Sequence, residues 1–174
     1  YWPSIVAAGI SIFNFILAFF ILREPPIEPH LRELNRRRFT WTLFKKSVAD
    51  GRLLYPMLAF FLATFAFVQL EITFGLFVLD RFKFDESDAG FLLAFLGITM
   101  AVVQGGLMGP LTRKFSEGRL ISVGALLACL GLIGIVTAGS FGPLLAALIF
   151  VACGYSLMNP CLSALTSKAS APGQ

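Results

Sequence analysis

Long apolar runs separated by short polar segments dominate this sequence. An apolar helix needs about 20 residues to cross the ~30 Å hydrocarbon core of a bilayer. Five runs qualify: residues 1–22, 53–79, 89–111, 120–138 and 142–165. The last two share one uncharged stretch, which we divide at the turn-forming cluster 139–143 because the stretch is long enough for two crossings. The pattern predicts an all-α integral membrane protein with about five transmembrane helices.

The composition agrees with a membrane environment and argues against several other classes. Of the 174 residues, 57% are hydrophobic and 14% are charged, whereas soluble domains average roughly 45–50% apolar and 25% charged residues. The net charge of +4 does not indicate a nucleic-acid partner, because the basic residues lie in short loops between apolar runs. The three cysteines lie within apolar runs and lack CxxC spacing. We therefore expect neither a metal site nor a cofactor.

The charge of the polar segments alternates along the chain and predicts the orientation of the helices. Segment 23–52 holds eight Lys or Arg residues and segment 112–119 holds three, whereas segment 80–88 holds two together with four acidic residues. Cytoplasmic loops of membrane proteins carry the excess of basic residues. We expect 23–52, 112–119 and 166–174 to be cytoplasmic and 80–88 and 139–143 to face outward, in a multi-pass protein of the inner or plasma membrane.

Segment 23–52 is the one long polar stretch, and it begins with several prolines. Further along, apolar side chains such as Trp41 and Phe44 alternate with Arg and Lys. This pattern favours an amphipathic helix on the inner membrane surface, with its basic groups toward anionic headgroups, over a solvated linker.

Glu71 is the one ionisable residue within any of the five runs, and it lies about 12 Å from the outer end of the second run at ~1.5 Å per residue. A carboxylate at that depth costs at least ~2.5 kcal/mol, so it should face protein or water, have a partner, or carry a proton. We favour a proton-coupling role over a salt bridge to the outer loop. Phe67 and Phe74 share its helix and are candidates for cavity lining.

Two neutral amides and one stripe of small residues complete the candidates within the runs. Gln104 either bridges helices or lines a cavity, and Asn159 precedes Pro160, so that a structural role at a kink competes with a cavity role. A small residue recurs every four positions in the third run, which places one smooth helix face against a neighbouring helix. The members of this stripe are Gly97, Ala101, Gly105 and Gly109.

The loop after the third run resembles a known motif. Residues 109–119 are similar to the Gly-x-Leu-x-Asp-Arg-x-Gly-Arg-type loop of the major facilitator superfamily, and the residues that we assign to this loop motif are Gly109, Leu111, Arg113, Lys114 and Arg119. Arg113 stands where that motif has Asp, and Ser116 stands where it has Gly.

The long basic segment resembles the cytoplasmic loop that joins the two six-helix halves of this superfamily. The resemblance implies that run 1–22 is similar to helix six, that 23–52 is the central linker, and that 53–174 holds helices seven to ten of a twelve-helix fold. The remaining helices would then be partners absent from this chain.

Two further stretches, 71–82 and 154–167, resemble the ends of helices seven and ten in drug- and tetracycline-exporter-like members. The resemblance implies a secondary transporter that exports small hydrophobic or amphiphilic molecules, driven by protons. An importer or facilitator of sugars or other metabolites is an alternative, but the runs offer few convergent polar groups for polar substrates. A non-transporting scaffold or receptor is a second alternative and would have no cavity. The sequence has no HExxH or GxSxG motif, and we do not expect an enzyme.

Overall fold

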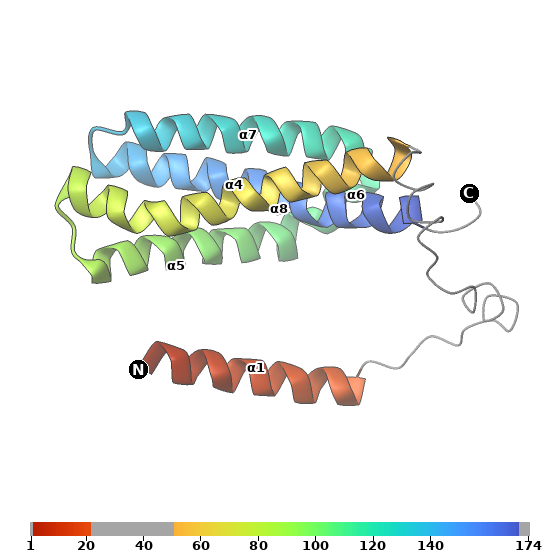
Figure 1. The fold of residues 1–174 in the computed structure, drawn as a ribbon, viewed down its shortest axis with the longest axis horizontal. Helices are drawn as coiled ribbons and strands as arrows, with labels where there is room; N and C mark the ends of the chain where they lie inside the picture. The colour runs from red at the N-terminus through yellow and green to blue at the C-terminus, as the bar shows by residue number, and fades with distance from the viewer. Residues whose placement is uncertain (1, 22–50, 171–174) are drawn as a thin grey trace, which may run out of the picture. The chain divides into compact units, whose positions relative to one another are not determined.

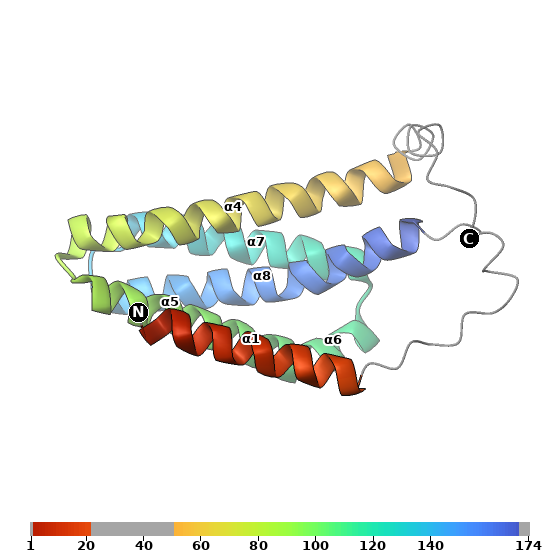
Figure 2. The same ribbon diagram turned by 60° about the horizontal axis from the view of Figure 1, so that its bottom comes forward.

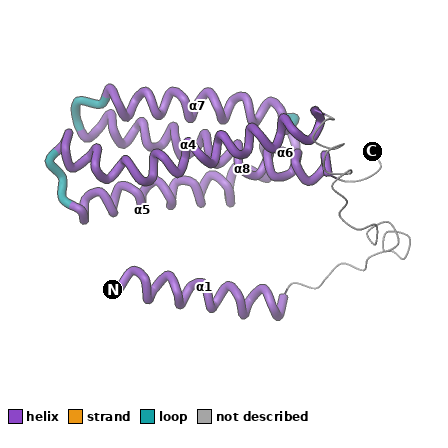
Figure 3. The backbone as a smooth tube through the Cα atoms, viewed as in Figure 1, coloured by secondary structure: helices purple, strands orange, loops and turns teal. Residues whose placement is uncertain are grey.

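The computed structural model describes residues 2–21 and 51–170. Within these two ranges every regular element is a helix (Figures 1 and 3). The chain divides into two compact units, 1–41 and 42–174, which are described separately. The predicted surface helix within 23–52 lies outside the described residues.

The first unit contains one described helix, α1 (Trp2–Ile21). This helix is apolar apart from a few small polar residues, and the hydroxyl of Ser11 donates to the carbonyl of Ala7 at 2.8 Å. A hydroxyl that bonds one turn back on its own helix needs no other partner in an apolar environment. The first predicted run is therefore a helix.

The second unit is a bundle of long helices. Its elements are α4 (Gly51–Phe82), α5 (Glu86–Val102), the π-helical segment η1 (Val103–Leu107), α6 (Met108–Lys114), α7 (Glu117–Thr137) and α8 (Phe141–Ser170). In the described part of the chain, four continuous helical stretches are long and apolar enough to cross a membrane. They correspond to the last four predicted runs, so the all-α membrane fold is confirmed.

The helices extend beyond the predicted runs because an apolar run ends at the first charged residue, whereas the helical backbone continues past it. The clearest case is the start of α5, which begins at Glu86 rather than near residue 89. The Asp85 carboxylate accepts from the Asp88 N–H at 2.8 Å, and the Asp88 carboxylate accepts from the Asp85 N–H at 3.3 Å. This reciprocal cap satisfies the first backbone donors of the helix.

The loops of the bundle gather at two opposite ends (Figure 2). At one end the loop before α5 meets the start of α8, where the rings of Phe84 and Phe141 lie 5.9 Å apart. At the other end Lys168 of α8 bonds Glu117 of α7 at 2.5 Å. The two loops predicted to face outward therefore share one end, as the alternation of charge requires. Which end faces the cytoplasm stays a prediction.

Helix α8 lies at the centre of the bundle and packs most closely against α7. Glycine makes this approach possible: a Cβ atom on Gly154 would lie 2.5 Å from the Ala128 nitrogen, and one on Gly131 would lie 2.6 Å from the Val151 nitrogen. Close backbone contact through small residues is a common way for helices to associate in lipid, where the hydrophobic effect does not drive them together.

The predicted stripe of small residues along α5, η1 and α6 makes no such close contact in the described unit. No atom lies within 4 Å of the Cβ position at Gly97, Gly105 or Gly109, and Ala101 is exposed. The described helices therefore do not supply the partner that we expected for this face. The close glycine contact occurs instead between α7 and α8.

Candidate substrate and proton site

The position of Glu71 follows from the two faces of α4. One face turns toward the bundle core and buries Ala63, Leu70, Phe74 and Val78. Glu71 lies on the exposed side of the helix. Its side chain has no hydrogen bond or ion pair with any residue that the structure describes.

The alternative of a salt bridge between Glu71 and the outer loop finds no support among the described residues. Lys83 in that loop instead lies 3.7 Å from Asp80, and both side chains are almost fully exposed. A surface pair of this kind contributes little, about 0–1 kcal/mol. The carboxylate on α4 is therefore available to water, to a ligand or to residues beyond the described part.

Both aromatic candidates on α4 pack against neighbouring helices. The Phe67 ring meets Tyr155 of α8 edge-on, with ring centroids 4.9 Å apart. Phe74 is 1% exposed and lines a groove of about 430 Å³ between α4 and α7, together with Gln69 and Thr73. Within this unit the two phenylalanines, each one turn from Glu71, join α4 to the bundle, whereas Glu71 itself is exposed.

A buried hydroxyl links α8 to α5 at the level of Tyr155. Ser156 is 0% exposed, and its hydroxyl donates to the Met100 carbonyl at 3.2 Å. The Val103 N–H also bonds this carbonyl. Sequence reasoning did not single out Ser156, because a serine in an apolar run carries no sign of which helix it will face.

Directly after this contact the third predicted run changes its helical form. Residues 103–107 form a π-helical turn in which the Met108 N–H bonds the Val103 carbonyl, five residues back. Gln104 and Gly105 lie within this turn, and Gln104 is exposed without a hydrogen-bond partner among the described residues. Such turns are frequent at functional sites. The adjacent pair Gly105-Gly106 was the signal that could have indicated the irregularity.

The polar candidates lie at different depths in the bundle. Glu71 follows Phe67 by one turn toward the end that holds Phe84, whereas Gln104 and Asn159 follow the Met100–Ser156 level by about one turn toward the opposite end. At ~1.5 Å per residue the separation along the helix axes is roughly 12 Å. The structure thus brings Phe67 to Tyr155, but does not place Glu71 beside either amide. No cluster of metal-ligating side chains occurs in the described ranges.

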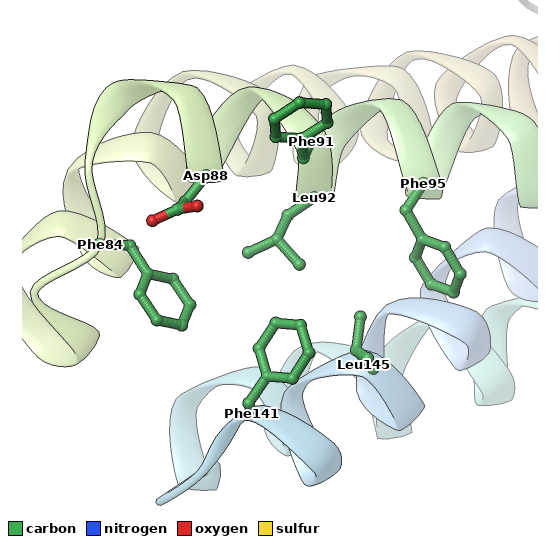
Figure 4. Close-up of a pocket in the computed structure, with 7 residues that line it drawn as sticks. All are labelled: Phe84, Asp88, Phe91, Leu92, Phe95, Phe141 and Leu145. Atoms are coloured by element: carbon green, nitrogen blue, oxygen red, sulfur yellow. The ribbon is translucent and has the colours of Figure 1, made fainter.

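An aromatic groove of about 590 Å³ lies between α5 and α8 at the end predicted to face outward (Figure 4). Figure 4 shows side chains from both helices directed into the same space, with the Asp88 carboxylate close to Phe84. The lining residues are Phe84, Asp88, Phe91, Leu92, Phe95, Phe141 and Leu145. Sequence reasoning missed this groove because its two walls are distant in the chain. Rings beside one carboxylate suit a molecule that is largely apolar and carries a polar or cationic group.

Comparison with known proteins places these observations in a family context. Residues 1–174 match the family described as Major Facilitator Superfamily. The chain is 28% identical over 166 residues to Multidrug resistance protein 1 of Bacillus subtilis, covering 95% of this chain and 42% of that protein. It is 32% identical over 120 residues to Major facilitator superfamily domain-containing protein 10 of Bos taurus, covering 67% of this chain and 25% of that protein. It is 27% identical over 176 residues to Solute carrier family 22 member 18 of Rattus norvegicus, covering 97% of this chain and 42% of that protein. The chain thus spans less than half the length of these relatives.

Proposed function

The chain belongs to the major facilitator superfamily, and we propose that it forms part of a proton-coupled transporter that exports small hydrophobic or amphiphilic molecules across the cell membrane. Membership makes it a segment of a multi-pass membrane transporter and not of an enzyme. Export is supported by its similarity to two Bacillus subtilis proteins that are named Multidrug resistance protein 1 and 2.

The observation that carries the proton-coupled part of the proposal is the environment of Glu71. It is the one acidic residue well inside the long apolar stretches of the second unit, it is exposed on α4, and it has no partner among the described residues. A charged carboxylate at membrane depth is costly and a protonated one much less so. Proton binding and release at this side chain therefore change the free energy of keeping it at this depth in the membrane.

Coupling follows if the substrate and the proton compete for the same carboxylate. A cationic or strongly dipolar substrate stabilises the ionised form, and a proton arriving from the outside displaces it. Because binding free energies are reciprocal, each ligand lowers the affinity for the other by the same factor. The exposed apolar side chains around Glu71 on α4, such as Val68 and Ile72, give an amphiphilic substrate surface to contact.

The test is Glu71→Gln in the full-length transporter, reconstituted in vesicles. The amide resembles the protonated acid in shape but cannot lose a proton, so we expect gradient-driven uphill export to be abolished while substrate exchange without a gradient is retained. Glu86→Gln, the same chemical change in the exposed first turn of α5, is the matched control and should transport normally. Uphill export that persists in Glu71→Gln, or loss of exchange together with folding, would reject Glu71 as the coupling group.

A further inference from the structure

A second groove lies at the opposite end of the bundle, where the chain passes from α6 into α7. It has a volume of about 440 Å³. Apolar side chains from four segments form its walls, namely Leu111 of α6, Phe115 of the connecting turn, Val123 of α7 and Leu157 of α8. Arg119 also lines this groove, close to the start of α7.

The basic side chains near this groove lack acidic partners. Glu117 is the one acidic residue at this end of the described bundle, and Lys168 of α8 already bonds it at 2.5 Å. Arg113, Lys114 and Arg119 form no ion pair with any described residue. This end of the unit therefore combines an apolar groove with uncompensated positive charge.

The position of Arg119 along α7 determines what could fill the groove. The residues that follow it in α7 carry no charge up to the end of that helix, so Arg119 lies where the apolar stretch begins. In a membrane this depth corresponds to the boundary between headgroups and acyl chains. An occupant must then be anionic at the boundary and apolar below it.

We propose that this groove binds an anionic phospholipid, with the phosphate at Arg119 and one acyl chain along Phe115, Val123 and Leu157. Basic pockets between transmembrane helices on the cytoplasmic side are typical sites for anionic headgroups. The charge complementarity excludes a cationic amphiphile at this position. The nearby Ser122 hydroxyl donates to the Gly118 carbonyl at 3.0 Å, and so Arg119 provides the selective contact.

Selectivity for this lipid depends on its headgroup. Inside a bilayer an acyl chain gains little by moving from other lipid chains to an apolar groove, because both surroundings are equally apolar. The groove fixes where the chain lies, and the guanidinium distinguishes an anionic headgroup from a zwitterionic one. Substitution of the guanidinium and obstruction of the groove should therefore affect lipid binding in different ways.

The test titrates dioleoyl phosphatidylglycerol, and separately dioleoyl phosphatidylcholine, into the full-length transporter in neutral detergent, with bound lipids counted by native mass spectrometry. The unaltered protein should prefer phosphatidylglycerol. Arg119→Gln should bind the first phosphatidylglycerol roughly fivefold more weakly, equivalent to about 1 kcal/mol, with phosphatidylcholine unchanged. Arg113→Gln removes the same charge from the last turn of α6, outside the groove, and should stay within about twofold of the unaltered protein.

A third variant tests the groove without changing charge. Val123 is about half exposed, and Val123→Trp should fill the groove and weaken binding of the first molecule of either lipid. Three results would each overturn the proposal: no preference for phosphatidylglycerol, equal weakening by Arg113→Gln and Arg119→Gln, or unchanged binding in Val123→Trp. The two arginine variants keep their test if the tryptophan variant does not fold, because both side chains are exposed.

Discussion

At the scale of single residues, polar side chains within the bundle fall into two groups. Most hydroxyls bond a carbonyl of their own helix, as Thr73 does with Gln69 at 2.7 Å and Thr99 with Phe95 at 2.8 Å. Ser156 is different because its partner is on another helix. A hydrogen bond within one helix does not determine how that helix packs. The hydrogen bond of Ser156 joins two helices, and so it fixes the register of α8 against α5.

Loss of the Ser156 hydroxyl should therefore destabilise the protein more than loss of an exposed one. We expect Ser156→Ala to lower the free energy of unfolding by about 0.6–1 kcal/mol, the usual worth of an interhelical hydrogen bond in a membrane protein. The cost is limited because the Met100 carbonyl keeps its bond from the Val103 N–H. Thermal unfolding of the full-length protein in detergent measures the effect, and Ser163→Ala, at an exposed position of the same helix, is the control. Equal stability of the two variants would show that the link to α5 contributes nothing.

At the scale of helices, the contact of α7 with α8 depends on the absence of side chains. Gly124, Ala128 and Gly131 recur at spacings of four and three, which places them on one face of α7. This face packs against Val151 and Gly154 of α8 so closely that the backbones of the two helices are in contact. Each of the three glycines has at least one backbone atom of the other helix among its nearest neighbours. A backbone atom cannot rotate away, so even one added methyl group would force the helices apart.

Gly131→Ala should consequently destabilise the protein, whereas Gly90→Ala should not. A Cβ atom at Gly131 would lie 2.6 Å from the Val151 nitrogen, and we expect a loss of about 1–3 kcal/mol from overpacking. At Gly90 nothing lies within 4 Å of the added atom, so alanine should be neutral or stabilise α5 by up to about 1 kcal/mol through its higher helix propensity. The melting temperatures of the two full-length variants test these expected changes in stability. Stabilisation by Gly131→Ala would mean that α7 and α8 are less tightly packed than the structure shows.

The helices themselves could be predicted from the sequence, whereas their partners could not. Apolar length is a local property, so runs such as 53–79 and 142–165 were recognised with errors only at their charged ends. Pairing depends on residues that are distant in the chain. The strict four-residue spacing from Gly97 to Gly109 drew attention to α5 and α6, while the less regular Gly124–Gly131 face makes the observed contact.

The same limit applies to the candidate site. Glu71 was recognisable because a single acid in an apolar run stands out without any knowledge of the fold. Two other features depend on tertiary packing. They are the aromatic groove, which Phe91 of α5 and Phe141 of α8 help to line, and the hydrogen bond from Ser156 to α5. The π-helical turn at 103–107 depends on backbone hydrogen bonds, and the adjacent glycines Gly105 and Gly106 are its one trace in the sequence.

At the scale of the whole molecule, the arrangement of the bundle ends makes the topology testable. Phe84, in the loop before α5, contacts the start of α8, and Glu117 at the start of α7 bonds the last turn of α8. Two loops therefore lie on the same side of the membrane when an even number of crossings separates them along the chain, and on opposite sides when the number is odd. One orientation measurement on one loop then assigns the side of every loop in the second unit.

The orientation is predicted from the basic residues, which cytoplasmic loops retain. Single cysteines at Lys45, Asp85 and Ser116, in an otherwise cysteine-free full-length protein, should react from outside with an impermeant thiol reagent only at position 85. Asp85 is exposed in the loop before α5, and Ser116 is exposed in the turn before α7 at the opposite end. Permeabilised cells supply the control, since position 116 should then react as well. External reaction at position 116 but not at 85 would show that the bundle has the opposite orientation. The Arg119 groove would then lie in the outer leaflet, and the aromatic groove beside Asp88 would lie on the cytoplasmic side.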